Sequence, residues 1–363
     1  MPWTSYAMFA AGVFLMFAPV GVLADMTHLG ADPIPRLVAN VLFSGGIAVA
    51  YVIVARRPQW LPVLVVAHIA LTTQFDRMLP ARTSPLAGAA LEARLSADTA
   101  VVSVAIIASF VLLTQVVQRE GGRYVRAHTE IALARDIHRL LVPPLSKRIG
   151  RFEFSGISVP SGDVGGDLVD LVDTDERWIG YVADVSGHGV GAGLLMGMVK
   201  SAARTQLRAA PSMSALLNEL NAVLLDLSKP DMFVTFAGMQ FDGASGLQFS
   251  LAGHLPILHV RPGSSSVDEL SLAQVPLAMF GDRRYTSAPV AFAPGDLFVI
   301  LTDGLTEVFD SHDRELGLEG VKGVIRQHAD APLDRVRDAL LAAAHGHGPQ
   351  LDDQTMLLIR ASA

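Results

Sequence analysis

Hydrophobic and polar positions divide this chain into two parts. Up to residue 118 the sequence consists of apolar runs separated by short polar segments, and after residue 149 shorter, alternating segments replace them. The four apolar runs are Tyr6–Ala24, Leu37–Ala55, Leu61–Phe75 and Ala100–Val117. Because a transmembrane helix needs about 20 apolar residues, with about 17 as the lower limit, three runs qualify by length and the third is short. The pattern predicts a transmembrane region of four helices over residues 1–118.

Arginines indicate the orientation of these helices, since basic residues favour cytoplasmic loops. Arg56 and Arg57 follow the second run, and Arg119, Arg123 and Arg126 follow the fourth. Four crossings that start inside place both groups in the cytoplasm, although the loop before the fourth run carries three further arginines. We expect a multi-pass protein of the inner or plasma membrane, in contact with lipid and with both ends cytoplasmic.

Two features of this region have alternative interpretations. The first run resembles a signal peptide with a small-residue cleavage site at Val22-Leu23-Ala24, but no Lys or Arg precedes it. His68 is the only ionisable residue well inside a run. Such a residue is a functional candidate by default, but in a short run it is also compatible with a place near the membrane interface.

Residues 119–149 form a predicted helical linker. Ile131, Ala134, His138 and Leu141 recur at steps of three and four residues, and two prolines after Val142 end the pattern. The helix either packs on its own domain or pairs with a second copy of the chain to give a homodimer, and so weak a heptad pattern does not distinguish the two.

Residues 150–363 alternate at period two in several segments, which predicts strands, with helices between them. The predicted helices cover Gly191–Ala210, Ser212–Leu227, Leu316–His328 and Leu333–Ala344. Strand pairs joined by short turns flank helix pairs, which favours antiparallel sheets with segregated helices, an α+β architecture, over alternating βαβ units.

Composition supports this division. Apolar residues make up 51% of the chain and the mean hydropathy is +0.40, which is too high for a chain wholly in water. Residues 1–118 hold five acidic and six basic side chains, whereas the remainder has a net charge of −8. An acidic chain without a basic footprint is not expected to bind nucleic acid. The absence of cysteine excludes disulfides, thiolate metal sites and thiol catalysis.

Acidic residues at strand ends are the candidate chemical groups. Asp167 follows two glycines, Asp184 and Asp303 end apolar strands, and Asp352 and Asp353 precede the last strand. A carboxylate at the end of a buried strand is costly unless it is paired, and few basic residues lie nearby in the sequence. A bound divalent cation would balance this charge, and oxygen ligands without cysteine favour Mg²⁺ or Mn²⁺ over zinc.

Six motifs in order resemble one family. They are SGDVGGDLVDL, YVADVSGHGVGAGLLM, LAGHLPILH, VPLAMFG, PGDLFVILTDGLTE and LDDQTMLLI. Together they resemble the stage II sporulation protein E-type branch of the metal-dependent protein phosphatases (PPM, or protein phosphatase 2C-like) over residues 150–361. The resemblance implies an αββα sandwich, in which two antiparallel sheets face each other with helices outside, for a phosphatase domain at residues 150–363.

The resemblance also implies a site with two Mn²⁺ or Mg²⁺ ions. Its metal-binding set is Asp167, Asp184, Val185 through its carbonyl, Asp303, Asp352 and Asp353. Asp184 would bridge both ions, and Asp303 and Asp352 would complete one of them. Asp167 would hold metal-bound waters or bind directly, and Asp353 ranks below Asp352 because relatives often have Asn there.

The implied reaction is attack of a metal-bridging hydroxide on phosphorus, with the serine or threonine oxygen leaving. Relatives of the eukaryotic branch place a histidine two residues after the bridging Asp, as a proposed general acid. Here that position is Ser186, and His188 follows two residues later, so His188 either donates a proton or orients the loop. His254, in LAGHLPILH, is expected to be structural.

We therefore expect a membrane-anchored serine/threonine phosphatase whose substrate is a phosphorylated cytoplasmic protein, by resemblance an anti-sigma-factor antagonist. One alternative is a catalytically silent scaffold or sensor that recruits a partner through the linker helix, which predicts loss of a metal-binding Asp. Another is a membrane-bound nucleotidyl cyclase, which needs a nucleotide-binding loop and a basic phosphate contact that the sequence does not show.

Overall fold

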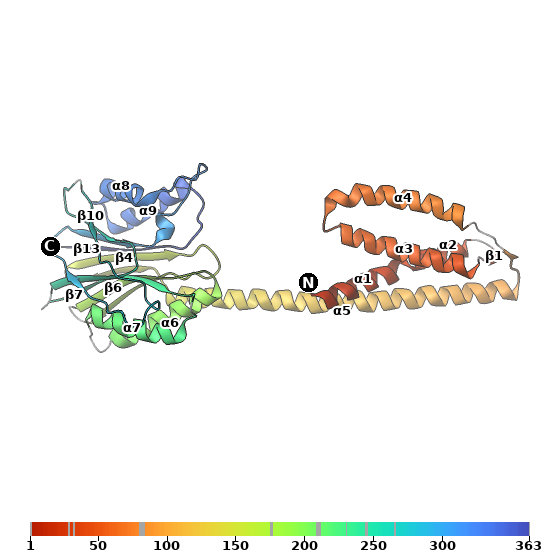
Figure 1. Ribbon diagram of the computed structural model, residues 1–363, viewed down its shortest axis with the longest axis horizontal. Helices are drawn as coiled ribbons and strands as arrows, with labels where there is room; N and C mark the ends of the chain where they lie inside the picture. Colours follow the sequence, from red (N-terminus) through yellow and green to blue (C-terminus); the bar gives the residue numbers. More distant parts are fainter. Residues whose placement is uncertain are drawn as a thin grey trace. The chain divides into compact units, whose positions relative to one another are not determined.

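The computed structural model describes residues 2–27, 30–31, 33–79, 84–174, 177–207, 212–229, 231–243, 246–264 and 266–362. The chain forms two compact units, Met1–His128 and Thr129–Ala363, each of which is described by itself. Figure 1 shows the elements of both units, a helical one and one with two sheets between helices.

The first unit is helical. Its elements are α1 (Trp3–Phe17), α2 (Pro19–Met26), α3 (Ile34–Val54), η1 (Pro58–Trp60), α4 (Leu61–Met78), the first part of α5 (Ala89–Leu141), and the two-residue strands β1 (Gly30–Ala31) and β2 (Ser84–Pro85). Buried Ser109 of α5 donates a hydrogen bond to the carbonyl of Gly12 in α1 at 2.8 Å, which joins the first and last helices of the unit. Large apolar side chains on α4 and α5 are exposed, including Val66 and Phe110, as expected for contact with lipid.

Three helices among the described residues are long and apolar enough to cross a membrane. They are Trp3–Ala24, Ile34–Val54 and Ala89–Leu141. α4 contains the short third run and ends in a polar turn with Arg77, and it does not reach this standard. Apolar helices thus occur where the first, second and fourth runs predict them, and the four-span topology stays a prediction.

α5 joins the fourth apolar run and the predicted linker in a single helix of 53 residues. At 1.5 Å per residue it is about 80 Å long, far more than the roughly 30 Å of a bilayer core, so it extends well beyond the span. His68 of α4 meets α3 through a hydrogen bond between its Nδ1 and the Tyr51 hydroxyl at 3.3 Å. The two residues border a cavity of about 490 Å³ among apolar side chains of α1, α2 and α3, and a sensing role for His68 stays a prediction.

The second unit contains two antiparallel sheets. One has the strand order β10-β9-β12-β13-β4-β3 and the other β11-β8-β7-β6-β5. Their bounds are β3 (Leu145–Ile149), β4 (Phe152–Val159), β5 (Leu168–Thr174), β6 (Arg177–Val185), β7 (Val234–Asp242), β8 (Gly246–Ala252), β9 (Ile257–Val260), β10 (Asp268–Leu270), β11 (Ala288–Pro289), β12 (Leu297–Leu301) and β13 (Gln354–Ala361). The alternating segments therefore predicted strands correctly.

Helices cover the outer face of each sheet. α6 (Val190–Leu207) and α7 (Met213–Leu227) pack on the five-stranded sheet, and α8 (Gly317–His328) and α9 (Leu333–His347) pack on the six-stranded sheet (Figure 1). Between the sheets, the rings of Phe152 and Phe154 each lie 4.9 Å from that of Trp178. The predicted sandwich of two antiparallel sheets flanked by helices is confirmed.

One strand lies where the sequence predicts a linker. β3 falls inside the range 119–149 but pairs with β4 as the edge strand of the six-stranded sheet. Its three central residues are polar and exposed, so it lacks the alternation that marks a half-buried strand. The sheet therefore begins five residues before the predicted domain start at residue 150.

Candidate metal-binding phosphatase site

The strand topology brings the predicted acidic residues to one edge of the sandwich. Asp184 lies at the end of β6 and Asp167 just before β5, and these strands pair through Leu168 and Ala183. In the other sheet, Asp303 starts the short helix η2 (Asp303–Leu305) after β12, next to Asp352, which lies before β13. Since the sheets face each other, the acidic strand ends converge.

Gly304 permits the closest approach in this region. A Cβ atom at residue 304 would overlap the backbone carbonyl of Asp353. The turn after β12 therefore packs directly on the segment before β13, which places Asp303 beside Asp352. The sequence TDG thus combines the acidic Asp303 with glycine at position 304, the one residue type that fits against the Asp353 carbonyl.

The carboxylates repel one another. Burial raises the pKa of Asp184 to about 7, with further contributions from the negative charges of Asp303, Asp352 and Asp353. Burial and the charge of Asp184 raise the pKa of Asp167 well above its usual range. Burial and the charge of Asp352 likewise raise the pKa of Asp303. Among the described residues, no cationic side chain is a cause of any of the three shifts, so the negative charge of these carboxylates is not balanced by a neighbouring Lys or Arg there.

This donor set fits divalent cations in charge and ligand type. Its side chains offer carboxylate oxygens, and Asp184, Asp303 and Asp352 influence one another electrostatically. The backbone carbonyl of Val185 follows Asp184 directly and lies close to Gly166, since a Cβ atom added to Gly166 would be 2.8 Å from its oxygen. Within the described part of the chain, however, no three His, Asp or Glu side chains converge closely enough to form a ready-made metal cage.

Asp353 has a different environment from its neighbour Asp352. Its carboxylate accepts hydrogen bonds from the backbone N–H groups of Ser161 and Gly166, each at 2.8 Å, and from that of Asp167 at 3.4 Å. The Ser161 hydroxyl also donates to it at 3.2 Å. Both oxygens of Asp353 therefore hold the loop of residues 161–167 in place, whereas its role as a metal ligand stays a prediction.

Thr302 is a site residue that sequence analysis did not identify. Its hydroxyl donates to Oδ2 of Asp167 at 2.8 Å and so links the two sheets at the acidic edge. Thr302 is buried and directly precedes Asp303. The only local signal was its place in the TDG motif.

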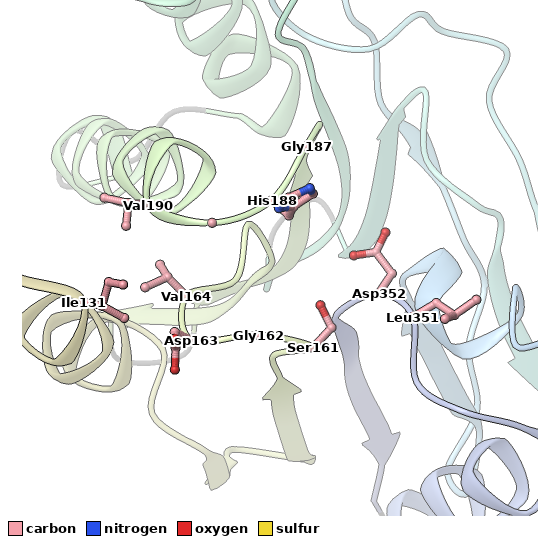
Figure 2. Close-up of a pocket in the computed structure, with 11 residues that line it drawn as sticks. Ile131, Ser161, Gly162, Asp163, Val164, Gly187, His188, Val190, Leu351 and Asp352 are labelled. Atoms are coloured by element: carbon pink, nitrogen blue, oxygen red, sulfur yellow. The ribbon is translucent and has the colours of Figure 1, made fainter. Parts of the chain in front are cut away.

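The two candidate histidines lie in different environments. His188 is exposed and borders a pocket of about 510 Å³ together with Ser161 and Asp352 (Figure 2). His254 is half-buried, and burial lowers its pKa to about 4, which keeps it neutral at physiological pH. The position of His188 allows contact with a substrate, but its role in catalysis stays a prediction.

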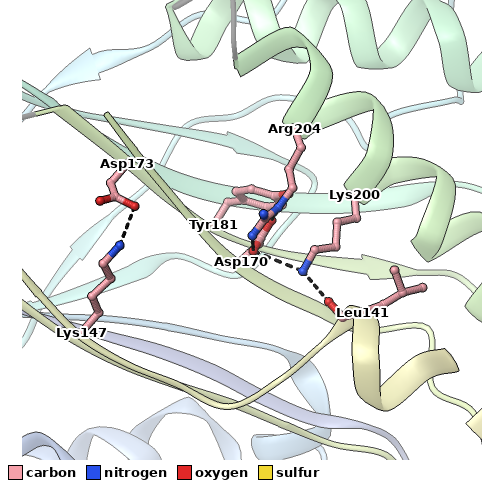
Figure 3. Close-up of polar contacts among 7 residues, drawn as sticks. All are labelled: Leu141, Lys147, Asp170, Asp173, Tyr181, Lys200 and Arg204. Carbon is pink, nitrogen blue, oxygen red and sulfur yellow. Dashed lines mark hydrogen bonds and ion pairs between the residues drawn. The ribbon is translucent and has the colours of Figure 1, made fainter. Parts of the chain in front are cut away.

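A second acidic residue on the five-stranded sheet is paired with basic side chains. Asp170 of β5 is buried and accepts two hydrogen bonds from Arg204 of α6, at 2.7 and 2.8 Å, and one from the Tyr181 hydroxyl at 3.2 Å (Figure 3). Lys200 lies 3.2 Å from the Asp170 carboxylate and donates to the carbonyl of Leu141 at the end of α5. Burial raises the pKa of Asp170, but the hydrogen bonds and charges of Arg204 and Lys200 outweigh it, so the pKa is lowered.

Sequence analysis did not identify this second centre. Asp170 occurs in the repeating segment DLVDLVD, and Lys200 and Arg204 are the only basic residues of α6, four positions apart on one helical face. That spacing was the only available signal, and it did not reveal the partner strand.

Comparisons with known proteins identify relatives of the second unit. Residues 174–362 match the family model of stage II sporulation protein E. The phosphoserine phosphatase RsbU of Bacillus subtilis (strain 168) is 26% identical over 181 residues, which are 49% of this chain and 54% of RsbU. This chain thus spans about half the length of that curated relative.

Solved structures show the same fold. The SiaA-PP2C domain of Pseudomonas aeruginosa superposes with a TM-score of 0.56 at 23% identity, over 66% of this chain and 98% of that domain. The PP2C phosphatase domain of SpoIIE from Bacillus subtilis, with a fragment of its regulatory domain, gives 0.51 at 16% identity, over 59% and 64%. Because the family model covers more than half of the sequence, the chain belongs to the stage II sporulation protein E family.

Proposed function

We propose that this protein is a membrane-anchored, metal-dependent serine/threonine phosphatase that acts on a phosphorylated cytoplasmic protein. The observation that carries the proposal is the group of buried and half-buried carboxylates, Asp167, Asp184 and Asp303, whose pKa values are raised and to whose shifts no cationic side chain of the described residues contributes. Perturbed pKa values of this kind gather at functional sites. The family membership and the phosphoserine phosphatase among the relatives support the same activity.

Two divalent cations, Mn²⁺ or Mg²⁺, would be held by Asp184, the Val185 carbonyl, Asp303 and Asp352. When bound, such ions activate water and offset the charge of the phosphoryl group. Asp167, fixed by Thr302, would orient water at the site. Asp353 would act mainly by fixing the loop of residues 161–167.

The proposed substrate carries phosphoserine or phosphothreonine, and we infer that it is an anti-sigma-factor antagonist. A phosphoserine phosphatase is among the relatives, and the name SpoIIE belongs to both the family and a structural neighbour. In this proposal a transmembrane region (1–118) and a helical linker (119–149) precede the phosphatase domain (150–363). Four spans with both ends inside would place that domain in the cytoplasm.

The linker helix is also proposed to pair with a second copy of the chain. In the second unit, Leu133, Ile137 and Leu140 of α5 are exposed, and Leu140 is 82% exposed. Replacing Ile137 with Asp should therefore change the mass of the full chain measured by light scattering in nanodiscs. An unchanged mass together with unchanged phosphatase activity would reject pairing through this face.

The activity is tested on the full chain in lipid nanodiscs with Mn²⁺ and either p-nitrophenyl phosphate or phosphoserine peptides. Asp184→Asn should lower phosphate release on the order of 1,000-fold, because it removes the central ligand. Asp173→Asn is the matched control, since Asp173 lies on β5 but pairs with Lys147 at the surface (Figure 3). A folded wild-type protein that binds Mn²⁺ and releases no phosphate would reject the proposal and favour a silent scaffold.

A further inference from the structure

The pocket beside the carboxylates has two chemically different ends. Asp352, His188 and Ser161 line the end next to the acidic residues, with exposed Leu351 beside Asp352 (Figure 2). Ile131, Val164 and Val190 gather at the other end, beside Asp163 (Figure 2). These three apolar residues come from three separate segments: the last turns of α5, the loop before β5 and the first residue of α6. A cleft that changes from polar to apolar along its length is suited to a ligand with the same division.

The apolar end is open rather than part of the core. Ile131 is 36% exposed and Val190 46% exposed, while Val164 is 6% exposed and forms the floor. Exposed apolar side chains with polar residues at their border commonly mark a binding surface.

Specific contacts hold this end in shape. Arg135 of α5 forms an ion pair with Asp163 of the loop. Val164 packs so closely on α6 that a Cβ atom at Gly193 would overlap its side chain. Because the walls are fixed by these contacts, little ordering is needed when a ligand enters.

We propose that this apolar end binds an apolar side chain of the protein substrate, located within a few residues of the phosphorylated serine or threonine. The inference rests on the proposed function, which places the phosphoryl group at the carboxylates. Asp352 belongs to both the carboxylate group and the pocket, so a chain bound at one continues into the other. An extended peptide advances about 3.3 Å per residue, which brings a neighbouring side chain into the pocket.

The apolar end disfavours acidic neighbours in the substrate. An acidic side chain that entered it would lose water contacts among Ile131, Val164 and Val190, where no compensating partner is offered by these three residues. An apolar side chain instead removes the exposed surfaces of Ile131 and Val190 from water. We therefore expect the order of preference leucine, then serine, then aspartate at the residue that enters the pocket.

The test uses the unaltered full chain in nanodiscs with Mn²⁺ and fluorescent peptides that carry the non-hydrolysable phosphonate analogue of phosphoserine, so that binding is measured without turnover. The peptides carry a single leucine, serine or aspartate at one of the three positions on either side, in a glycine and serine background. Fluorescence anisotropy should show that leucine at one position tightens binding about tenfold over serine.

Pocket variants establish where this preference arises. Ile131→Ser with Val190→Ser should reduce the leucine preference to about twofold or less. Leu194→Ser is the matched control, because Leu194 is exposed on α6 one turn beyond Val190 and does not border the pocket; it should keep the full preference. Circular dichroism checks that each variant is folded. In turnover assays with hydrolysable phosphoserine peptides, the double variant should raise KM for the leucine peptide several-fold more than KM for p-nitrophenyl phosphate.

Two results would overturn the inference. One is that leucine gives no preference at any position, or that the preference survives in the double variant. The other is that the double variant changes the mass of the full chain in solution, because the apolar end would then be a contact between copies. Failure of the proposed function has a different signature, in which the peptides bind with the leucine preference but intact protein releases no phosphate with Mn²⁺.

Discussion

Asp170 and Asp184 lie on paired strands of one sheet, yet their surroundings are opposite. Asp170 has Arg204 and Lys200 beside it, and its pKa is lowered. The pKa of Asp184 is raised by burial and by the negative charges of Asp303, Asp352 and Asp353. The comparison shows that burial alone does not distinguish a structural acid from a functional one; the source of the balancing positive charge does. Asp170 finds that charge within the protein, whereas in the proposed function Asp184 would receive it from bound cations.

The largest expected difference between the two centres is in stability. Asp170→Asn should lower the free energy of unfolding by about 3 kcal/mol, because it leaves the mostly buried Lys200 ammonium without its partner. Asp184→Asn in metal-free protein should be neutral or stabilising, because it removes repulsion. Urea denaturation of both variants without metal measures the difference, and equal destabilisation would contradict the comparison.

The pH dependence of stability tests the same difference between Asp170 and Asp184. A carboxyl group whose pKa is raised to about 7 in the folded state favours folding while it is protonated. That stabilisation is complete below the unfolded pKa of about 4 and is lost as pH rises through about 7. Metal-free protein should thus be more stable at pH 5.5 than at pH 8, by at most about 2 kcal/mol from this group.

Added Mn²⁺ should act in the opposite direction. Because metal binding displaces protons from the carboxylates, the Mn²⁺-induced rise in melting temperature should be larger at pH 8 than at pH 5.5. Thermal unfolding at both pH values, with and without Mn²⁺, gives the measurement. Asp184→Asn serves as the control, since it should reduce both effects, and a Mn²⁺ effect independent of pH would contradict the assignment.

The smallest expected effect concerns Thr302. Thr302→Val keeps the shape of the side chain but removes two hydrogen bonds, the one donated to Asp167 and the one accepted from the backbone N–H of Thr355, which should cost about 1–2 kcal/mol of stability. Phosphate release should fall less than in Asp184→Asn, because Asp167 loses its support and not its carboxylate. Thr205→Val, which loses only a bond to its own helix, is the control and should leave both quantities nearly unchanged.

Local patterns predicted the sandwich and the acidic edge. Apolar and polar residues alternate along several strands, so these strands are visible in the local sequence. An Asp that ends an apolar run is visible there too, because it directly follows the run. Asp184 and Asp303 were found in this way, and the topology then brought them together. The family resemblance supplied the expected roles, which the geometry alone does not assign.

Features that depend on distant contacts were not predictable. The pairing of Asp170 with Lys200 and Arg204 joins a strand to a helix about 30 residues away, and no single segment contains its signal. β3 is an edge strand with polar exposed positions, so its sequence resembles a linker. The pocket has the same character, because Ile131, Val164 and Val190 meet only after folding.

The tight turn at Gly304 has a consequence for substitutions at this edge. Even a methyl group there would act as a wedge between the turn after β12 and the segment before β13. It would move Asp303 away from Asp352 without altering either residue. A change from glycine to alanine, usually regarded as conservative, is therefore expected to weaken metal binding while both acidic side chains remain in the chain.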